Sequence, residues 1–209
     1  MKHLLRPQFL VLKKRILPCR CSFLHFPKTI PSPDLSHDSL KRRIDRASDS
    51  TVSIIPLLRE WSQFGNGTTL SDLRRIISSL HGSNRFSHAL QISEWMSGQD
   101  IYNLTSLDYE TRLLLIAKVH GLQEAHGFLD TIPLQMRGFY VHSALLNRCK
   151  AESSLSIAES TFQNMSDLGF TKNQPEPYNT MLCLYHEAGN HDMVVNLLRE
   201  MDNYDMEPK

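Results

Sequence analysis

The 209-residue sequence predicts an all-α fold, a short solenoid built from helix–turn–helix repeats. Apolar residues recur at the i, i+3, i+4, i+7 spacing of one helical face along most of the chain. Turns that contain Gly or Asn interrupt these stripes, so the predicted helices come in pairs. The pairs repeat about every 35 residues, and the alternation expected of β-strands is weak.

Residues 1–33 differ from the remainder in charge and are expected to form a transit peptide. They hold seven basic and no acidic residues, which leaves 16 basic and 22 acidic residues for the rest. Large apolar residues alternate with the cations, as in the amphipathic leader of an imported organellar protein. Ser and Thr are scarce before Ser32, which favours a mitochondrion over a chloroplast. A basic RNA-binding or membrane-surface arm is the alternative.

Residues 34–69 are expected to form a linker and one N-terminal helix, and residues 70–105 a degenerate repeat. A Gly-Asn-Gly turn at 65–67 ends that helix, and a Gly-Ser-Asn turn at 82–84 divides the repeat. The apolar residues of the three predicted helices are Ile54, Ile55, Leu57, Leu58 and Trp61; Leu73, Ile76, Ile77 and Leu80; and Phe86, Ala89, Ile92, Trp95 and Met96.

Two further repeats are predicted, a degenerate one at 106–138 and a more regular one at 139–173. In the first, His120-Gly121 forms the turn and Pro133 ends the second helix. In 106–138 the first helix carries Tyr109, Leu113, Ile116 and Ala117, and the second carries Leu122, Ala125, Leu129 and Ile132. In 139–173 the first helix carries Leu145, Leu146 and Cys149, and the second carries Leu155, Ala158, Phe162 and Met165.

Residues 175–209 form the clearest repeat. Gly189-Asn190 separates its two helices, and Asp192 is predicted to cap the second one. A helix hairpin with one apolar side on each helix needs stacked neighbours. We therefore expect an exposed apolar edge on the second helix, either because the array is truncated or because a partner covers it. The two stripes are Tyr178, Met181, Leu182 and Tyr185, then Val194, Val195, Leu197, Leu198 and Met201.

The sequence disfavours catalysis and cofactor binding. The four cysteines, the ten histidines and the glycines show no spacing typical of a disulfide framework, a zinc site or a phosphate-binding loop. No catalytic triad can be inferred from the scattered Ser, His and Asp residues. No segment approaches the ~20 apolar residues of a membrane span. We therefore expect no catalytic residue, metal, cofactor, small-molecule substrate or membrane insertion.

Several motifs of 175–209 occur together in one known repeat family. They are Tyr178-Asn179-Thr180 at the start of the first helix, Tyr185, Ala188-Gly189, the Leu197-Leu198-x-x-Met201 run and Glu207-Pro208. With these motifs the unit resembles the pentatricopeptide repeat family. The resemblance is weaker over 139–173 and covers about 40–209 in order, where the chain looks like plain-repeat members from plant mitochondria.

This resemblance implies a right-handed superhelix that binds single-stranded organellar RNA as a non-catalytic adaptor in RNA metabolism, alongside other RNA-processing proteins. In this family, base choice follows the residue after the opening Tyr and the last residue of the repeat. Carried over, the base-reading pairs are Asn179 with Lys209, and Ser143 with Asn173, which favours a purine, mainly adenine. Glu110, at the same place in 106–138, departs from the pattern and indicates a unit that supports rather than reads.

Charge keeps other interpretations open. Trp61 and Trp95 can stack on bases, but their places in apolar stripes favour core packing. The acidic remainder weighs against strong non-specific RNA binding, because Lys and Arg supply that affinity. A tetratricopeptide-like protein scaffold and an inactive truncated repeat protein therefore stay as alternatives. The candidates for phosphate contacts, for which a solvated face is the other interpretation, are Lys41, Arg42, Arg43, Arg74 and Arg75.

Overall fold

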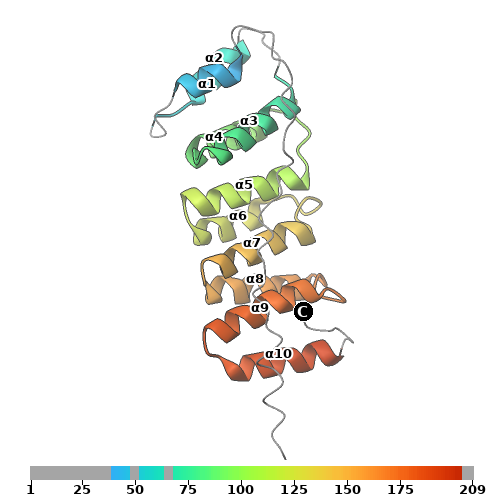
Figure 1. Cartoon of the computed structure of the whole chain (residues 1–209). Coiled ribbons are helices and arrows are strands. Elements are labelled where there is room, and N and C mark those ends of the chain that lie inside the picture. The colour runs from blue at the N-terminus through green and yellow to red at the C-terminus, as the bar shows by residue number, and fades with distance from the viewer. Residues whose placement is uncertain (1–38, 48–51, 64–67, 204–209) are drawn as a thin grey trace, which may run out of the picture. The chain divides into compact units, whose positions relative to one another are not determined.

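The computed structural model describes residues 39–47, 52–63 and 68–203, so the predicted transit peptide lies outside it. In these ranges the chain forms ten α-helices and no β-strand, which confirms the all-α solenoid class (Figure 1). The helices are α1 (Leu40–Arg46), α2 (Ile55–Gln63), α3 (Leu70–Gly82), α4 (Phe86–Ser97), α5 (Ser106–Val119), α6 (Leu122–Thr131), α7 (Phe139–Ala151), α8 (Leu155–Asp167), α9 (Pro175–Glu187) and α10 (His191–Asn203).

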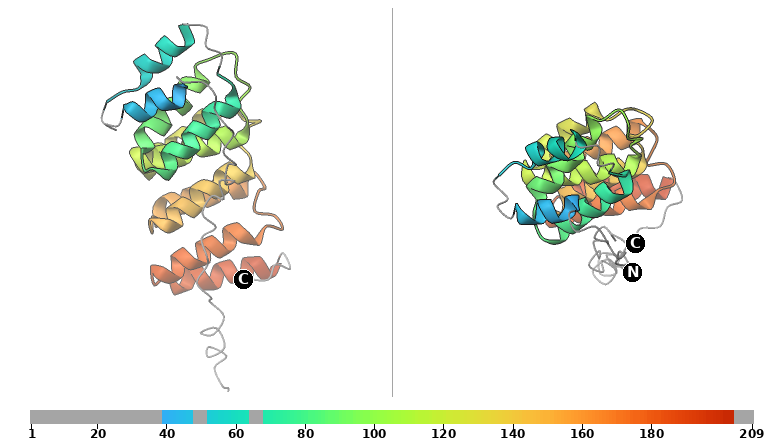
Figure 2. Two further views of the ribbon diagram at one scale, coloured as in Figure 1. Left: turned by 45° about the horizontal axis from the view of Figure 1, so that its top comes forward. Right: turned by 90° about the horizontal axis from the view of Figure 1, so that it is seen from above.

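The described residues divide into two compact units, and the chain passes from the first to the second between Arg148 and Cys149, near the end of α7. In the first unit α3 packs on α4, α4 on α5 and α5 on α6, while α2 contacts both α1 and α4. In the second unit α9 lies between α8 and α10, and the last two helices run antiparallel (Figure 2). Contacts between consecutive pairs, α4 with α5 and α8 with α9, cover the side that one hairpin leaves open.

Capping boxes define where α3 and α5, the first helices of two repeats, begin. Thr69 precedes α3, and its side chain accepts a hydrogen bond from the Asp72 amide at 3.1 Å while Asp72 binds back to the Thr69 amide. Thr105 and Asp108 form the same reciprocal pair before α5. Each box satisfies two of the amide groups that a helix start leaves without partners. The first helices therefore begin at positions that their own sequence defines.

The helix boundaries differ from the prediction at both ends of the chain. The predicted cap at Asp192 is wrong, because the Asn190 side chain accepts from the Met193 amide at 3.3 Å and α10 already begins at the next residue. Gly189, with a φ of 71°, turns the chain so that Asn190 takes the cap position. At the other end, α1 was not predicted, since seven residues are too few to show a periodic stripe.

The apolar stripes form the core of each unit. All four predicted stripe residues of α3 are buried, and so are Leu113, Ile116 and Ala117 of α5. Burying one such aliphatic side chain stabilises a fold by about 1.5–3 kcal/mol, so the stripes dominate the energetics. In α10, Leu197 and Met201 are buried but Val195 is 38% exposed, which gives this helix the partly exposed apolar edge that was expected.

Arg85, which precedes α4, connects α4 to α1 through hydrogen bonds. Its guanidinium donates to the carbonyl oxygens of Ile44 and Ala47, at 2.9 and 2.5 Å, at the end of α1. Its Nε also lies 3.1 Å from Nδ1 of His88, whose Nε2 is 2.8 Å from the Val52 carbonyl oxygen. His88 is fully buried, so this network replaces the water that these carbonyls would otherwise bind.

Two tyrosines join α9 to its neighbours through carboxylates. The Tyr178 hydroxyl donates to Glu200 of α10 at 2.7 Å, and the Tyr185 hydroxyl donates to Glu159 of α8 at 3.1 Å. Tyr178 also meets the Phe162 ring edge-on, with centroids 5.1 Å apart. The tyrosines of the repeat motif thus act as packing residues that hold three consecutive helices together.

Burial, the hydrogen bond to Glu159 and the charge of that carboxylate raise the pKa of Tyr185 to about 12. A phenol in the unfolded chain ionises near pH 10. The protonated form therefore contributes stability that is complete below about pH 10 and is lost as the pH rises to about 12.

We expect Tyr185→Phe to remove one late step from the ultraviolet titration of tyrosinate. Tyr140→Phe, which changes a 76% exposed ring, should leave that late step in place. A late step of unchanged amplitude in the Tyr185 variant would show that this hydroxyl is not held as described.

Candidate functional site

The four first helices α3, α5, α7 and α9 each carry a polar residue at their fifth position. These residues are Arg74, Glu110, Ser143 and Asn179, and the last two are predicted base readers. Ser143 and Asn179 are 6% and 9% exposed, and the other two are partly buried. Because buried polar groups normally have partners, the surroundings of each residue indicate its role.

Arg74 is held in an ion pair between repeats. Its Nε and Nη2 donate to the two carboxylate oxygens of Asp108 at 2.7 and 2.6 Å, and Nη2 lies 3.4 Å from the Thr105 hydroxyl. Asp108 belongs to α5 and is only 8% exposed. Burial alone raises the pKa of Asp108, but the hydrogen bonds from Arg74 and Thr105 outweigh it, so the pKa lies below its usual value. Arg74 thus joins α3 to α5.

Ser143 is a buried hydroxyl in α7. Its Oγ makes no hydrogen bond within the described part of the chain. A buried polar atom left in this way is costly for the fold, by roughly 1–3 kcal/mol. This oxygen has almost no surface open to solvent, so a bound group could supply the missing hydrogen bond only after the Ser143 side chain rotates.

Two of the other predicted base readers, Asn173 and Asn179, lie in the second unit. Asn179 is buried in the second turn of α9, and Asn173 is exposed in the turn before that helix, with a φ of 59°. An Asn accepts this left-handed conformation more readily than most residues do. Lys209 lies outside the described residues, so the pair it was predicted to form with Asn179 stays a prediction.

Glu110 is half-buried in α5. Burial raises the pKa of its carboxyl group. The described residues provide it with no hydrogen bond and no ion pair, in contrast to Asp108 two residues earlier. Residues two apart in an α-helix lie on roughly opposite sides of its axis. Glu110 therefore faces away from the side of α5 on which Asp108 binds Arg74.

Exposed apolar side chains, which were not predicted as functional residues, lie one helical turn before two of these fifth positions. Leu107 is 59% exposed and precedes Glu110 by three residues, while Tyr140 is 76% exposed and precedes Ser143 by three. Residues i and i+3 share a helical face. The available signal was a large apolar residue outside the core stripe, one turn before each fifth position.

Most of the predicted phosphate-contacting cations already have an acidic neighbour. Lys41 binds Asp45 at 2.6 Å, Arg75 binds Asp72, and Arg43 lies 3.6 Å from Glu60 and over the Trp61 ring. Together with the pairing of Arg74, these contacts mean that a phosphate would have to compete with carboxylates. Arg42 is exposed on α1.

Both tryptophans of the chain are half-buried. Trp61 donates its Nε1 hydrogen to the Thr68 hydroxyl at 2.8 Å, and Trp95 packs beside Tyr102 with ring centroids 6.2 Å apart. These contacts favour packing roles over base stacking.

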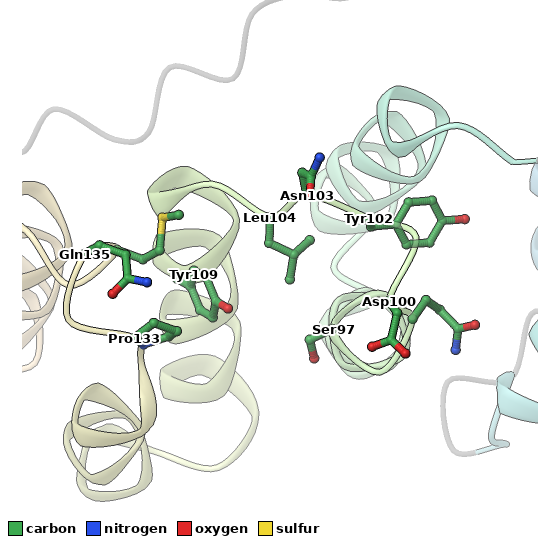
Figure 3. A pocket seen from close by; sticks show the side chains of 10 residues that line it. Ser97, Asp100, Tyr102, Asn103, Leu104, Tyr109, Pro133 and Gln135 are labelled. Atoms are coloured by element: carbon green, nitrogen blue, oxygen red, sulfur yellow. The ribbon is translucent and has the colours of Figure 1, made fainter.

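A cleft of about 520 Å³ lies between the chain segments that enter α5 and leave α6 (Figure 3). Gln135 and Pro133 border it on one side with the Tyr109 ring, and Asn103 and Asp100 lie across from them. Its lining contains one carboxylate and no Lys or Arg, which makes it unfavourable for a phosphate group.

Two further classes of site are not seen in the part of the chain that the structure describes. No group of three or more His, Cys, Asp or Glu side chains is placed to hold a metal ion there. None of the helices in the same ranges has the length and hydropathy needed to cross a bilayer.

Similarity to named proteins shows which family the chain belongs to. The chain is 43% identical over 208 residues to a mitochondrial pentatricopeptide repeat-containing protein of Arabidopsis thaliana, covering 100% of this chain and 42% of that protein. Two proteins of the same plant that are named putative pentatricopeptide repeat-containing proteins are also similar. One is 43% identical over 172 residues, covering 82% of this chain and 30% of that protein, and the other is 33% identical over 187 residues, covering 90% and 70%. The chain belongs to the pentatricopeptide repeat family. No family model matches it.

Pentatricopeptide repeat relatives also bear on localisation. Several of them are mitochondrial proteins, at 43%, 35% and 28% identity, which confirms the mitochondrial localisation predicted from the sequence. The chain spans less than half the length of the first two relatives, with 42% and 30% covered. The transit peptide itself stays a prediction, because residues 1–33 are not described.

The ion pair between α3 and α5 gives a test of how the repeats are held together. We expect Asp108→Asn to lower the free energy of unfolding by roughly 1–3 kcal/mol at pH 7, because the charged hydrogen bonds from Arg74 are lost. The difference should vanish in acid, since the lowered pKa of Asp108 means that its contribution is present above about pH 4 and lost below. Urea denaturation at several pH values measures both.

Asp130→Asn is the matched control for this variant. Asp130 pairs with Arg137 at 2.9 Å but is 80% exposed, so its loss should cost less than about 1 kcal/mol. Equal effects of the two variants at pH 7 would contradict a special role for the buried pair.

Proposed function

We propose that this chain binds single-stranded RNA with sequence selectivity, as a non-catalytic adaptor of mitochondrial RNA metabolism. The observation that carries the proposal is an arrangement found on α5 and α7, in which a buried or half-buried polar residue follows an exposed apolar one by a single turn. Ser143 after Tyr140 is its clearest instance. Membership of the pentatricopeptide repeat family supports the same function.

The chemistry of this arrangement suits an unstacked base. A base has a flat apolar face and a polar edge, and single-stranded RNA presents both to a protein. An exposed ring such as Tyr140 can stack on the face, while the Ser143 hydroxyl can exchange a hydrogen bond with the edge. In duplex RNA these edges are paired, so the proposed mode of binding requires single strands.

The charge distribution sets the expected strength of binding. The chain outside residues 1–33 has 16 basic and 22 acidic residues, and the candidate cations Lys41, Arg43, Arg74 and Arg75 each have a carboxylate neighbour. Phosphate attraction is therefore weak, and base contacts supply a larger share of the affinity than in a basic RNA-binding domain. The same charge favours the second candidate function, a protein-binding scaffold of the tetratricopeptide kind.

A pull-down of plant mitochondrial RNA with the full chain distinguishes RNA binding from protein binding. We expect the full chain to enrich particular transcripts, and the double variant Ser143→Ala, Asn179→Ala to lose that enrichment, because two base-edge contacts disappear. Ser156→Ala with Asn164→Ala, two exposed residues of α8, is the matched control and should keep the enrichment. Weak, salt-sensitive recovery of all RNAs by every protein would rule out selective binding.

Tyr140 provides a second test. Stacking of one base on an aromatic ring is worth about 1–3 kcal/mol, so Tyr140→Ala should weaken binding of a selected RNA roughly 5- to 150-fold. Tyr140→Phe keeps the ring and should bind almost as well as the original chain. Fluorescence anisotropy of a labelled RNA measures both affinities. An equal loss in the two variants would mean that the ring does not stack on a base.

A further inference from the structure

The connections that lead into α5 and α7 expose apolar side chains at equivalent places. Ile101 is 77% exposed and Leu134 is 75% exposed, and each lies five residues before the first helix that follows it. One exposed aliphatic side chain is ordinary on a protein surface. These two adjoin the same cleft, because it is lined by their chain neighbours Asp100, Tyr102, Pro133 and Gln135. Exposed apolar residues that gather around a concavity indicate an interaction site.

The cleft of about 520 Å³ combines apolar surface with hydrogen-bonding groups. Leu104, Tyr109 and Met136 supply apolar surface, and Figure 3 shows Leu104 between the two walls. The cleft is also lined by three side-chain amides that form no hydrogen bond with other described residues, those of Gln99, Asn103 and Gln135. Binding pockets commonly have volumes of about 300–1,000 Å³. A peptide, which is part apolar and part amide, therefore suits this cleft in size and in chemistry.

The chain that enters α5 borders the cleft with open main-chain groups. Residues 102–105 are neither helix nor turn, and Thr105 is extended, with a φ of −108° and a ψ of 168°. In the part of the chain that the structure describes, the main chain of Asn103 and Leu104 makes no hydrogen bond. A non-helical segment whose N–H and C=O groups are open can pair with a second extended segment.

The charge of the cleft indicates which kind of partner fits. Asp100 is the only charged residue of the described lining. Its carboxylate is exposed and has neither an ion pair nor a hydrogen bond with other described residues. A carboxylate attracts Lys or Arg and repels phosphate. The cleft therefore disfavours nucleic acid and favours a peptide that carries a cation.

We propose that this cleft binds an extended segment of a partner protein in which a large apolar residue adjoins Lys or Arg. The apolar side chain packs beside Leu104 and Tyr109, and the cation pairs with Asp100. The main chain of the segment exchanges hydrogen bonds with residues 103–104. In this mode of recognition the main-chain hydrogen bonds give affinity, and the side-chain contacts give specificity. Binding of such a segment does not require RNA.

Selection of random linear peptides on the full chain tests this proposal, followed by fluorescence anisotropy of one labelled peptide from the selected pool. We expect the selected peptides to share Lys or Arg next to Leu, Ile or Phe. Asp100→Lys should weaken binding of the labelled peptide roughly tenfold or more, because a like charge replaces an attractive one. Changing the cation of the peptide to Glu should restore binding to this variant.

Asp202→Lys is the matched control, since it reverses the charge of an exposed carboxylate on α10. It should bind the labelled peptide as the original chain does, and thermal melting should show both variants to be folded. Equal binding of the peptide to the two variants, or selection of no peptide, overturns the proposal. Displacement of the peptide by single-stranded RNA of random sequence, with tighter RNA binding by Asp100→Lys, also overturns it, because the cleft would then be an RNA site.

Discussion

Stacking of one helix pair on the next is the constraint on which the rest of this structure depends. Each hairpin has an apolar side on each helix, and a single pair cannot remove both from water. Contacts such as those of α4 with α5 and of α8 with α9 provide the second burial. Within each unit this packing holds consecutive helices against one another, and the repeat pattern of the sequence gives a residue at a given position of one first helix a counterpart in the next.

The same stacking decides which polar residues serve the fold and which are available for a ligand. Arg74 and Asp108 satisfy each other between repeats, and the tyrosines of α9 bind carboxylates of the helices on either side. Glu110 and Ser143 receive no such partner from the described chain. Residues at equivalent places in the repeats therefore have different roles, so the repeat pattern alone does not define a reading site.

Much of the fold could be predicted from the sequence, because the helical stripes and the Gly-containing turns are local signals. The predicted stripe of α3 is buried throughout, whereas the cap of α10 was placed at Asp192 instead of Asn190 because both residue types favour that position. The pairing of Arg74 with Asp108 could not be predicted, since it depends on how two repeats pack. The exposure of Tyr140 likewise depends on which face of α7 its neighbours cover.

The central claim is that RNA bases contact the first helices, one turn apart at their second and fifth positions. Ultraviolet crosslinking of a bound single-stranded RNA, followed by mass spectrometry of the crosslinked peptides, tests this most directly. The account predicts crosslinks within 107–110 and 140–143, on the faces that carry Leu107 and Tyr140. Crosslinks confined to the basic residues 1–46, or to the second helices α4, α6 and α8, would contradict it.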